Sequence, residues 1–186
     1  MSLTTNALSS SIMPSSAARV RAETLRDVIA ECDRRLDGLL PMDVDGVADT
    51  FRDEPTLLAA LQLRWYTSLS HQLDVSVAEL PDALEGAAVR GWRRTSRELP
   101  GVRLVLDHYA EHPTDDRMAA MVAKGLAKER QLLAVASGVT APLAPVDEET
   151  VLIGRALETR AREGYQPPNR PASPTLLGRL KAVLAA

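Results

Sequence analysis

The sequence contains few aromatic residues, one cysteine and no long apolar run. Aromatic residues make up 3% of the 186 residues, whereas hydrophobic residues make up 45%. The core must therefore be built mainly from Leu, Val and Ala. Ala and Leu enter helices at little cost, and the strand-favouring residues never form the alternating runs that are typical of strands. The sequence predicts an all-α fold.

The single cysteine and the absence of long apolar segments also bear on location. Cys32 has no partner for an intramolecular disulfide, which suits a reducing compartment. Residues 1–16 lack the basic start and apolar centre of a secretory signal, and we expect this Ser- and Thr-rich stretch to be disordered. No stretch approaches the ~18 apolar residues of a membrane span. We expect a cytoplasmic protein without a membrane span.

The charge distribution does not favour nucleic acid as a partner. The formal net charge is −3, with 22 basic and 25 acidic residues interspersed along the chain. Such a chain has no overall positive field to attract a phosphate backbone. A DNA-binding regulator remains an alternative, although no short recognition helix after a tight turn is apparent.

Helical periodicity and capping residues divide residues 17–164 into four or five helices. We expect helices over about 17–37, from an Asp53 N-cap to Leu80, from a capping box at Asp82 and Glu85, from Thr114 or Asp115 to Ser137, and from Asp147 to Gly164. Pro100 and Gly101 interrupt the third pattern and predict a kink or break. Short connections favour antiparallel neighbours, so the sequence predicts an up-and-down antiparallel bundle. Its apolar stripes are also compatible with burial between two copies of the chain.

The three histidines suggest a metal site only weakly. His108 and His112 are one helical turn apart, and His71 is a distant third. Two histidines at this spacing can face one metal, but HYAEH is not the HExxH motif of zinc proteases. We predict no metal or other cofactor, and keep a metal- or cofactor-dependent bundle enzyme that uses these histidines as an alternative.

Four arginines share one predicted helix face, around the sequence RGWRRTSR. Arg90, Arg93, Arg94 and Arg97 recur at helical spacing. Such a face can pair with acidic residues of neighbouring helices, or bind an acidic protein or a phosphate. Trp92 projects away from the stripe and is expected in the core, which leaves no exposed aromatic ring to stack on bases.

The C-terminal residues have a different character. Four prolines between residues 167 and 174 predict a semi-rigid linker over 165–174. Residues 175–186 follow with one apolar face, formed by Leu176, Leu177, Leu180, Val183 and Leu184. A helix of this length is not stable alone in water. It must dock on its own bundle, in a groove of a partner or, less in keeping with its composition, on a membrane surface.

This layout of helical body, proline-rich spacer and short apolar terminus resembles that of cargo proteins targeted to bacterial protein shells. LLGRLKA is loosely similar to their glycine-leucine docking peptides, whereas the iron-binding residues usual in their bundles are missing. No nucleophile elbow, P-loop or dinucleotide fingerprint is present. We therefore expect a non-enzymatic protein, an adaptor, regulator or shell-associated cargo, that binds a protein partner through the C-terminal segment and the arginine face.

Overall fold

A computed structural model describes residues 16–141 and 147–167, and this part of the chain contains helices and no strands. The all-α prediction is confirmed. The seven helices are α1 (Ser16–Arg35), α2 (Val47–Phe51), α3 (Glu54–Glu79), α4 (Leu84–Glu98), α5 (Pro100–Glu111), α6 (Asp116–Ala136) and α7 (Glu148–Arg162). The count exceeds four or five because the third predicted helix breaks at Pro100 into α4 and α5, and because the turn before Asp53 forms α2.

Most predicted helix starts are confirmed by their capping hydrogen bonds. The carboxylates of Asp53, Asp115 and Asp147 each accept a backbone N–H from the residue three positions later, at 2.8, 2.7 and 2.8 Å. Such caps satisfy N–H groups that have no partner inside the helix. The predicted capping box at Asp82 and Glu85 is wrong. The N-cap position of α4 falls on Ala83, which makes no side-chain cap, and Glu85 instead pairs with Arg160 of α7 at 2.8 Å.

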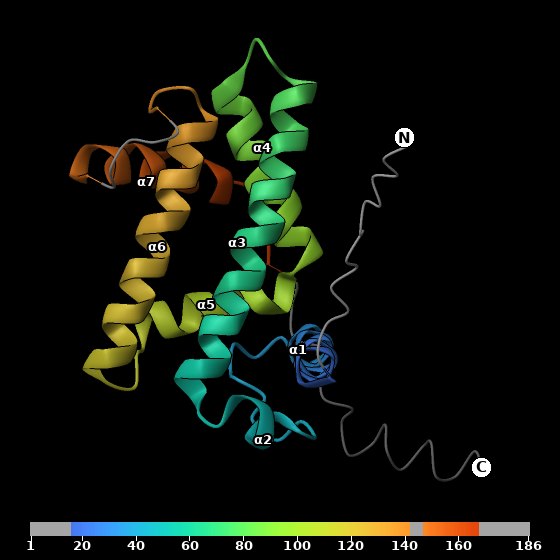
Figure 1. The fold of residues 1–186 in the computed structure, drawn as a ribbon. Coiled ribbons are helices and arrows are strands. Elements are labelled where there is room, and N and C mark those ends of the chain that lie inside the picture. The colour runs from blue at the N-terminus through green and yellow to red at the C-terminus, as the bar shows by residue number, and fades with distance from the viewer. Residues whose placement is uncertain (1–15, 142–146, 168–186) are drawn as a thin grey trace, which may run out of the picture.

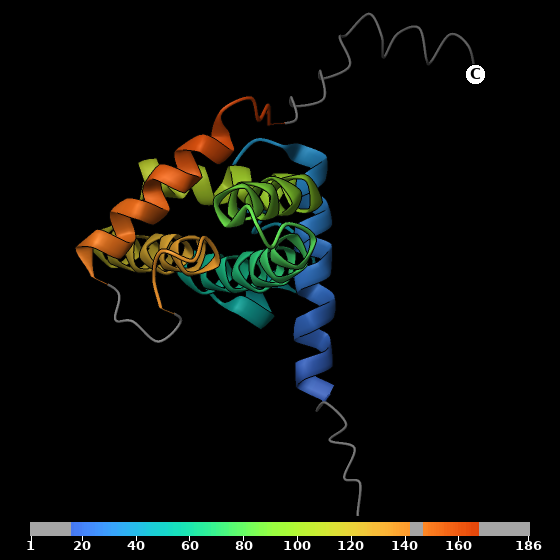
Figure 2. The same cartoon turned by 90° about the horizontal axis from the view of Figure 1, so that it is seen from above.

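The helices form a bundle in which only part of the arrangement is up-and-down. α3 and α4 form an antiparallel hairpin, and α6 runs alongside them (Figure 1). α1, seen end-on in Figure 1, extends at full length across the others in Figure 2, and α7 crosses α6 obliquely. The bundle prediction is therefore confirmed, while α1, α5 and α7 lie across the direction expected from short loops alone.

The core is centred on two tryptophans. Trp65 of α3 and Trp92 of α4 meet edge to face, with ring centroids 6.1 Å apart, a geometry that aromatic pairs prefer. Leu and Val side chains from α1 to α7 complete the core around them, as the composition predicted. Leu39, beyond the end of α1 at Arg35, is exposed.

Two glycines allow pairs of helices to cross in direct backbone contact. A Cβ atom at Gly154 of α7 would overlap the carbonyl oxygen of Arg130 in α6, and one at Gly101 of α5 would overlap the backbone of Cys32 in α1. The Gly101 N–H also donates to the Asp33 carboxylate at 2.8 Å. The α6–α7 and α1–α5 crossings therefore depend on the absence of a side chain at Gly154 and at Gly101.

Several predictions concern residues beyond the described ranges. The expected N-terminal tail lies outside them except for Ser16, which begins α1. The linker from Pro168 and the predicted helix at 175–186, with its five apolar residues, also lie outside. Across residues 16–141 and 147–167, no helix is long and apolar enough to cross a membrane.

Candidate functional site

A network of six charged residues, alternating in sign, crosses the middle of the molecule. It links α5, α6 and α7 through ion pairs at 2.7 to 3.2 Å. In order of contact its members are Arg130, Glu158, Arg162, Asp107, Arg103 and Glu129. Three positive and three negative groups balance, which is how ionised side chains become tolerable inside a protein.

Arg103 and Glu129 form the buried end of this network. Their side chains are 1% and 6% exposed, and Arg103 Nη1 donates to both Glu129 carboxylate oxygens at 3.2 Å. Trp92 Nε1 donates to the same carboxylate at 3.0 Å. The Arg103 guanidinium lies over the Trp65 ring, 4.6 Å from its centroid, a favourable cation–π contact. The Glu129 carboxylate therefore accepts hydrogen bonds from two buried side chains, Arg103 and Trp92.

Asp107 sits between two guanidinium groups. Partial burial raises the pKa of its carboxyl, but the charges of Arg103 and Arg162 outweigh burial, so the net pKa lies below the ordinary value. Burial lowers the pKa of the Arg162 guanidinium, and the carboxylates of Asp107 and Glu158 reverse that effect, so its pKa is raised. Both groups are charged at neutral pH.

The depressed pKa of Asp107 predicts a contribution to acid sensitivity. A carboxyl with a lower pKa in the folded state stabilises the protein above its unfolded pKa, and that contribution is lost as pH falls through the folded pKa. As pH falls below about 4, the ordinary pKa of an aspartate, wild-type protein should therefore lose stability more steeply than the Asp107→Asn variant. Urea unfolding midpoints across this range test the expectation, and parallel profiles for the two proteins would contradict it.

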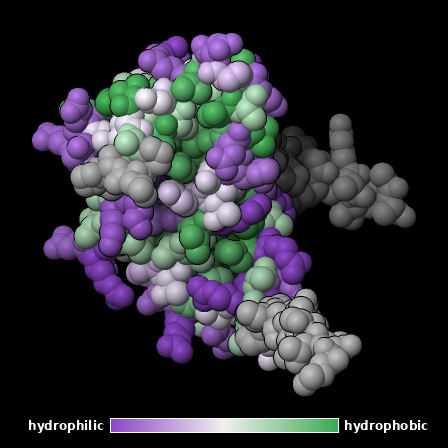
Figure 3. Space-filling view, turned by 45° about the horizontal axis from the view of Figure 1, so that its top comes forward, coloured by the Kyte–Doolittle hydropathy of each residue, from purple (hydrophilic) through white to green (hydrophobic). Residues whose placement is uncertain are grey.

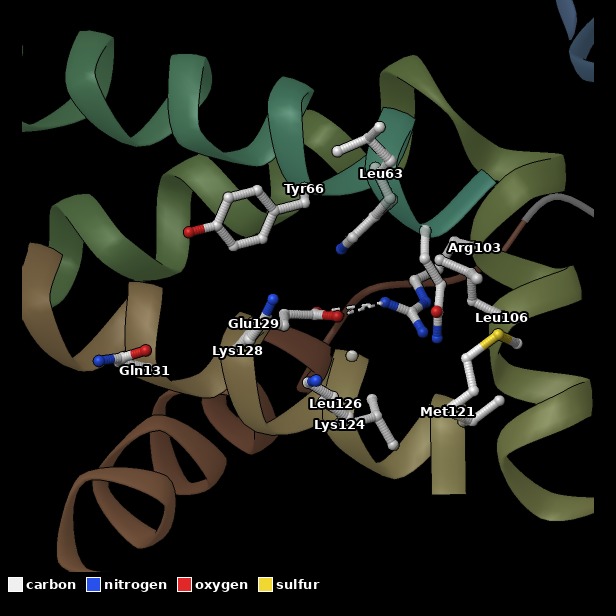
Figure 4. A pocket seen from close by; sticks show the side chains of 14 residues that line it. Leu63, Tyr66, Arg103, Leu106, Met121, Lys124, Leu126, Lys128, Glu129 and Gln131 are labelled. Atoms are coloured by element: carbon white, nitrogen blue, oxygen red, sulfur yellow. Dashed lines mark hydrogen bonds and ion pairs between the residues drawn. The ribbon is translucent and has the colours of Figure 1, made fainter. Parts of the chain in front are cut away.

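A pocket opens beside the buried pair, between α3, α5 and α6. Its volume is about 420 Å³, within the roughly 300–1,000 Å³ usual for small-molecule sites. Figure 4 shows the Arg103–Glu129 pair in the middle of the view, with Leu63 and Tyr66 of α3 on one side and Lys124 and Lys128 of α6 on the other. The walls are mainly apolar and comprise Leu63, Tyr66, Leu106, Met121, Val122 and Leu126.

Two buried N–H groups in the pocket lining have no acceptor among the described residues. These are Trp65 Nε1 and Arg103 Nε. An unsatisfied buried donor costs about 1–3 kcal/mol, and most such groups in proteins are paired. The pocket thus combines apolar walls with hydrogen-bonding capacity that the described chain does not use.

The predicted arginine face is distributed among internal contacts, with one exception. Arg93 donates to backbone oxygens of Arg160, Ala161 and Glu163 at the end of α7, at 2.6 to 3.0 Å. Arg90 and Arg94 pair with Glu79 at 3.3 and 2.9 Å. Arg97 is exposed and makes no ion pair within the described ranges. The face can therefore offer Arg97 to a partner without disturbing the fold.

The structure brings two of the three histidines together. The rings of His108 and His112 stack with centroids 5.1 Å apart, whereas His71 is on the exposed surface of α3. Residues 16–141 and 147–167 contain no group of three or more His, Cys, Asp or Glu placed to hold a metal ion. The geometry therefore provides no argument for the histidine-based alternative.

The described chain ends in an anchored segment. The Tyr165 ring packs edge to face on Trp92, at 5.5 Å between centroids, and its hydroxyl donates to the Ser96 carbonyl at 3.1 Å. The sequence predicts Tyr165 as the first residue of the linker, but in the structure this residue packs on the helical body. The described part of the chain therefore ends in a segment that packs on α4, the helix that also carries Arg97.

The pocket and its charged pair were missed in the sequence, although a signal was present. Glu129 occupies the apolar stripe of α6 that runs through Val122, Leu126 and Leu133, and Arg103 follows Leu99 and precedes Leu106 at helical spacing. A charged residue on a buried stripe needs a partner in the core. The sequence does not show that these two residues meet, because the crossing of α5 and α6 brings them together.

Comparison with protein-family models, with curated proteins and with solved structures finds no match for this chain.

Proposed function

We propose that this is a non-enzymatic, cytoplasmic helical protein that binds a protein partner through its C-terminal segment. The proposed docking residues are Leu176, Leu177, Leu180, Val183 and Leu184. The observation that carries the proposal is the anchoring of Tyr165 on Trp92 and Ser96. Tyr165 precedes the predicted segment in sequence and packs on α4, which also carries Arg97, the one arginine of the face that has no ion pair in the described part of the chain.

The position of Tyr165 on α4 supports a composite surface. A partner that binds the apolar segment and also contacts the body near Tyr165 can engage the exposed Arg97 side chain of the same helix. Short apolar helices are recognised by partner grooves through residues at helical spacing, and a charged residue at the rim adds specificity and association rate more than affinity. The partner is therefore expected to present an apolar groove with an acidic rim.

The test is affinity capture from the native host with full-length protein and with a chain ending at Pro167. The cut must follow Tyr165, because that side chain belongs to the core. Full-length protein should retain a partner that the shortened chain and the Leu177→Ala/Leu180→Ala variant lose. Arg179→Ala/Lys181→Ala, which alters residues off the apolar face, is the matched control and should retain it.

Thermal unfolding of the same proteins separates the alternatives. Binding in trans predicts that the shortened chain unfolds at the same temperature as full-length protein. A substantially lower unfolding temperature, together with identical captured partners, would show that the segment docks on its own bundle and would overturn the proposal.

A further inference from the structure

The pocket between α3, α5 and α6 has the chemistry of a site for a small amphipathic anion, which is independent of the proposed C-terminal docking. Its walls are mainly apolar side chains, with Gln62 and Gln131 also in the lining, and Leu63 and Tyr66 of α3 are 66% and 38% exposed. Large solvent-exposed apolar side chains beside a pocket of about 420 Å³ indicate a surface that can bind an apolar molecule. In Figure 3 one face of the molecule shows apolar side chains bordered by hydrophilic ones.

The mouth of the pocket is positively charged. Lys124 and Lys128 are one turn apart on α6, are both exposed and both line the pocket. They are two of only three lysines in the chain, and neither forms an ion pair with any residue the structure describes. Most arginines of the body, in contrast, are paired. Two neighbouring ammonium groups without a counterion form a receptor for a carboxylate.

The floor of the pocket sets the direction in which a ligand lies. The Glu129 carboxylate is there, already engaged by Arg103 and Trp92, and it would repel a second carboxylate. Two residues of the lining, Arg103 and Trp65, also carry buried N–H donors without an acceptor in the described part of the chain, Arg103 Nε and Trp65 Nε1. These donors suit a neutral oxygen, such as a hydroxyl or carbonyl. The anionic end therefore belongs at the lysines and the neutral polar end at the floor.

We infer that this pocket binds a small apolar carboxylic acid, with the carboxylate at Lys124 and Lys128 and a hydroxyl or carbonyl oxygen directed to Arg103 Nε and Trp65 Nε1. Net charge at the pocket supports this polarity, because the network that contains Arg103 and Glu129 is balanced and the two exposed lysines add to it. An amphipathic cation of the same length would place its positive charge beside Lys124 and Lys128 and would be repelled.

Three probes of equal chain length test the inference by calorimetry: decanoate, 10-hydroxydecanoate and decyltrimethylammonium. Wild-type protein should bind decanoate at one site, and 10-hydroxydecanoate more tightly, because only the latter places an oxygen at the floor. The cation should bind at least about tenfold more weakly than decanoate at low salt, and the difference should shrink as salt is added. Equal affinity for anion and cation, or no saturable binding of decanoate, would overturn the inference.

Charge-reversal variants locate the site. Lys124→Glu/Lys128→Glu should weaken decanoate binding at least about tenfold and reverse the preference toward the cation. Arg117→Glu/Arg155→Glu carries the same change of charge on exposed residues outside the pocket and should leave affinity within about twofold. Equal losses of decanoate affinity in the two variants would show that only the overall charge of the protein matters, and would contradict the assigned site.

Tryptophan fluorescence gives a second readout at the pocket. Trp65 lines it, and the only other tryptophan is the buried Trp92. Decanoate should alter the emission of wild-type protein, and Trp65→Phe should remove most of that change. Retention of the full change in Trp65→Phe would place the ligand elsewhere and overturn the assignment.

Discussion

Replacement of Gly154 by alanine is expected to destabilise the protein by about 3 kcal/mol or more. The added methyl would occupy the space of the Arg130 carbonyl oxygen, which belongs to the backbone of α6 and cannot rotate away. Relief therefore requires α6 and α7 to move apart, and their separation loosens the ion pair between Arg130 of α6 and Glu158 of α7. For a chain of this size such a loss corresponds to roughly 10 °C in unfolding temperature, measurable by circular dichroism.

Gly86→Ala is the matched control for this substitution. Gly86 lies within α4, and a Cβ there would meet nothing closer than the Ala83 Cβ at 3.9 Å. Alanine favours the helix over glycine by about 1 kcal/mol, so this variant should be as stable as wild-type protein or slightly more stable. A Gly154→Ala protein as stable as Gly86→Ala would show that the α6–α7 contact is looser than described.

Replacement of Glu129 by leucine is expected to cost about 3–5 kcal/mol. The change leaves Arg103 with only the partly exposed Asp107 as counterion and removes the acceptor of Trp92 Nε1. An uncompensated charge in an apolar interior is among the most costly defects a substitution can produce. Chemical unfolding in urea measures the loss directly.

The double variant Arg103→Met/Glu129→Leu tests the cause. If the cost of Glu129→Leu comes from the stranded guanidinium, removal of that group should restore much of the stability, since well-packed apolar residues often replace a buried pair without loss. Trp92 Nε1 stays unsatisfied in the double variant, so recovery will be incomplete by about 1–3 kcal/mol. Losses that simply add would indicate that the two side chains do not interact.

Much of the fold could be predicted because it depends on local chemistry. Asp53, Asp115 and Asp147 cap helices through hydrogen bonds to residues three positions away, so each signal and its consequence lie within one turn. The break at Pro100 follows equally from the missing N–H of proline. Such features require no knowledge of the rest of the chain.

The site could not be predicted because its parts come from distant segments. Arg103 meets Glu129 across 26 positions of sequence, and Arg93 reaches the end of α7 across 68. The direction in which α1, α5 and α7 cross the bundle depends on backbone contacts at Gly101 and Gly154. A helical pattern contains no information on crossing angles. The assignment of Tyr165 to a linker failed for the same reason, since its partners Trp92 and Ser96 lie on another helix.

The burial of Cys32 in α1, which packs against Gly101 of α5, allows thiol chemistry to detect local opening of the fold. Cys32 is the only cysteine, is 3% exposed, and has a pKa raised by burial to about 12. Alkylating reagents attack the thiolate, which the folded protein neither forms at neutral pH nor exposes. Each modification event therefore requires an opening that exposes this thiol, and the rate of thiol labelling in native buffer reports how readily α1 detaches from the core.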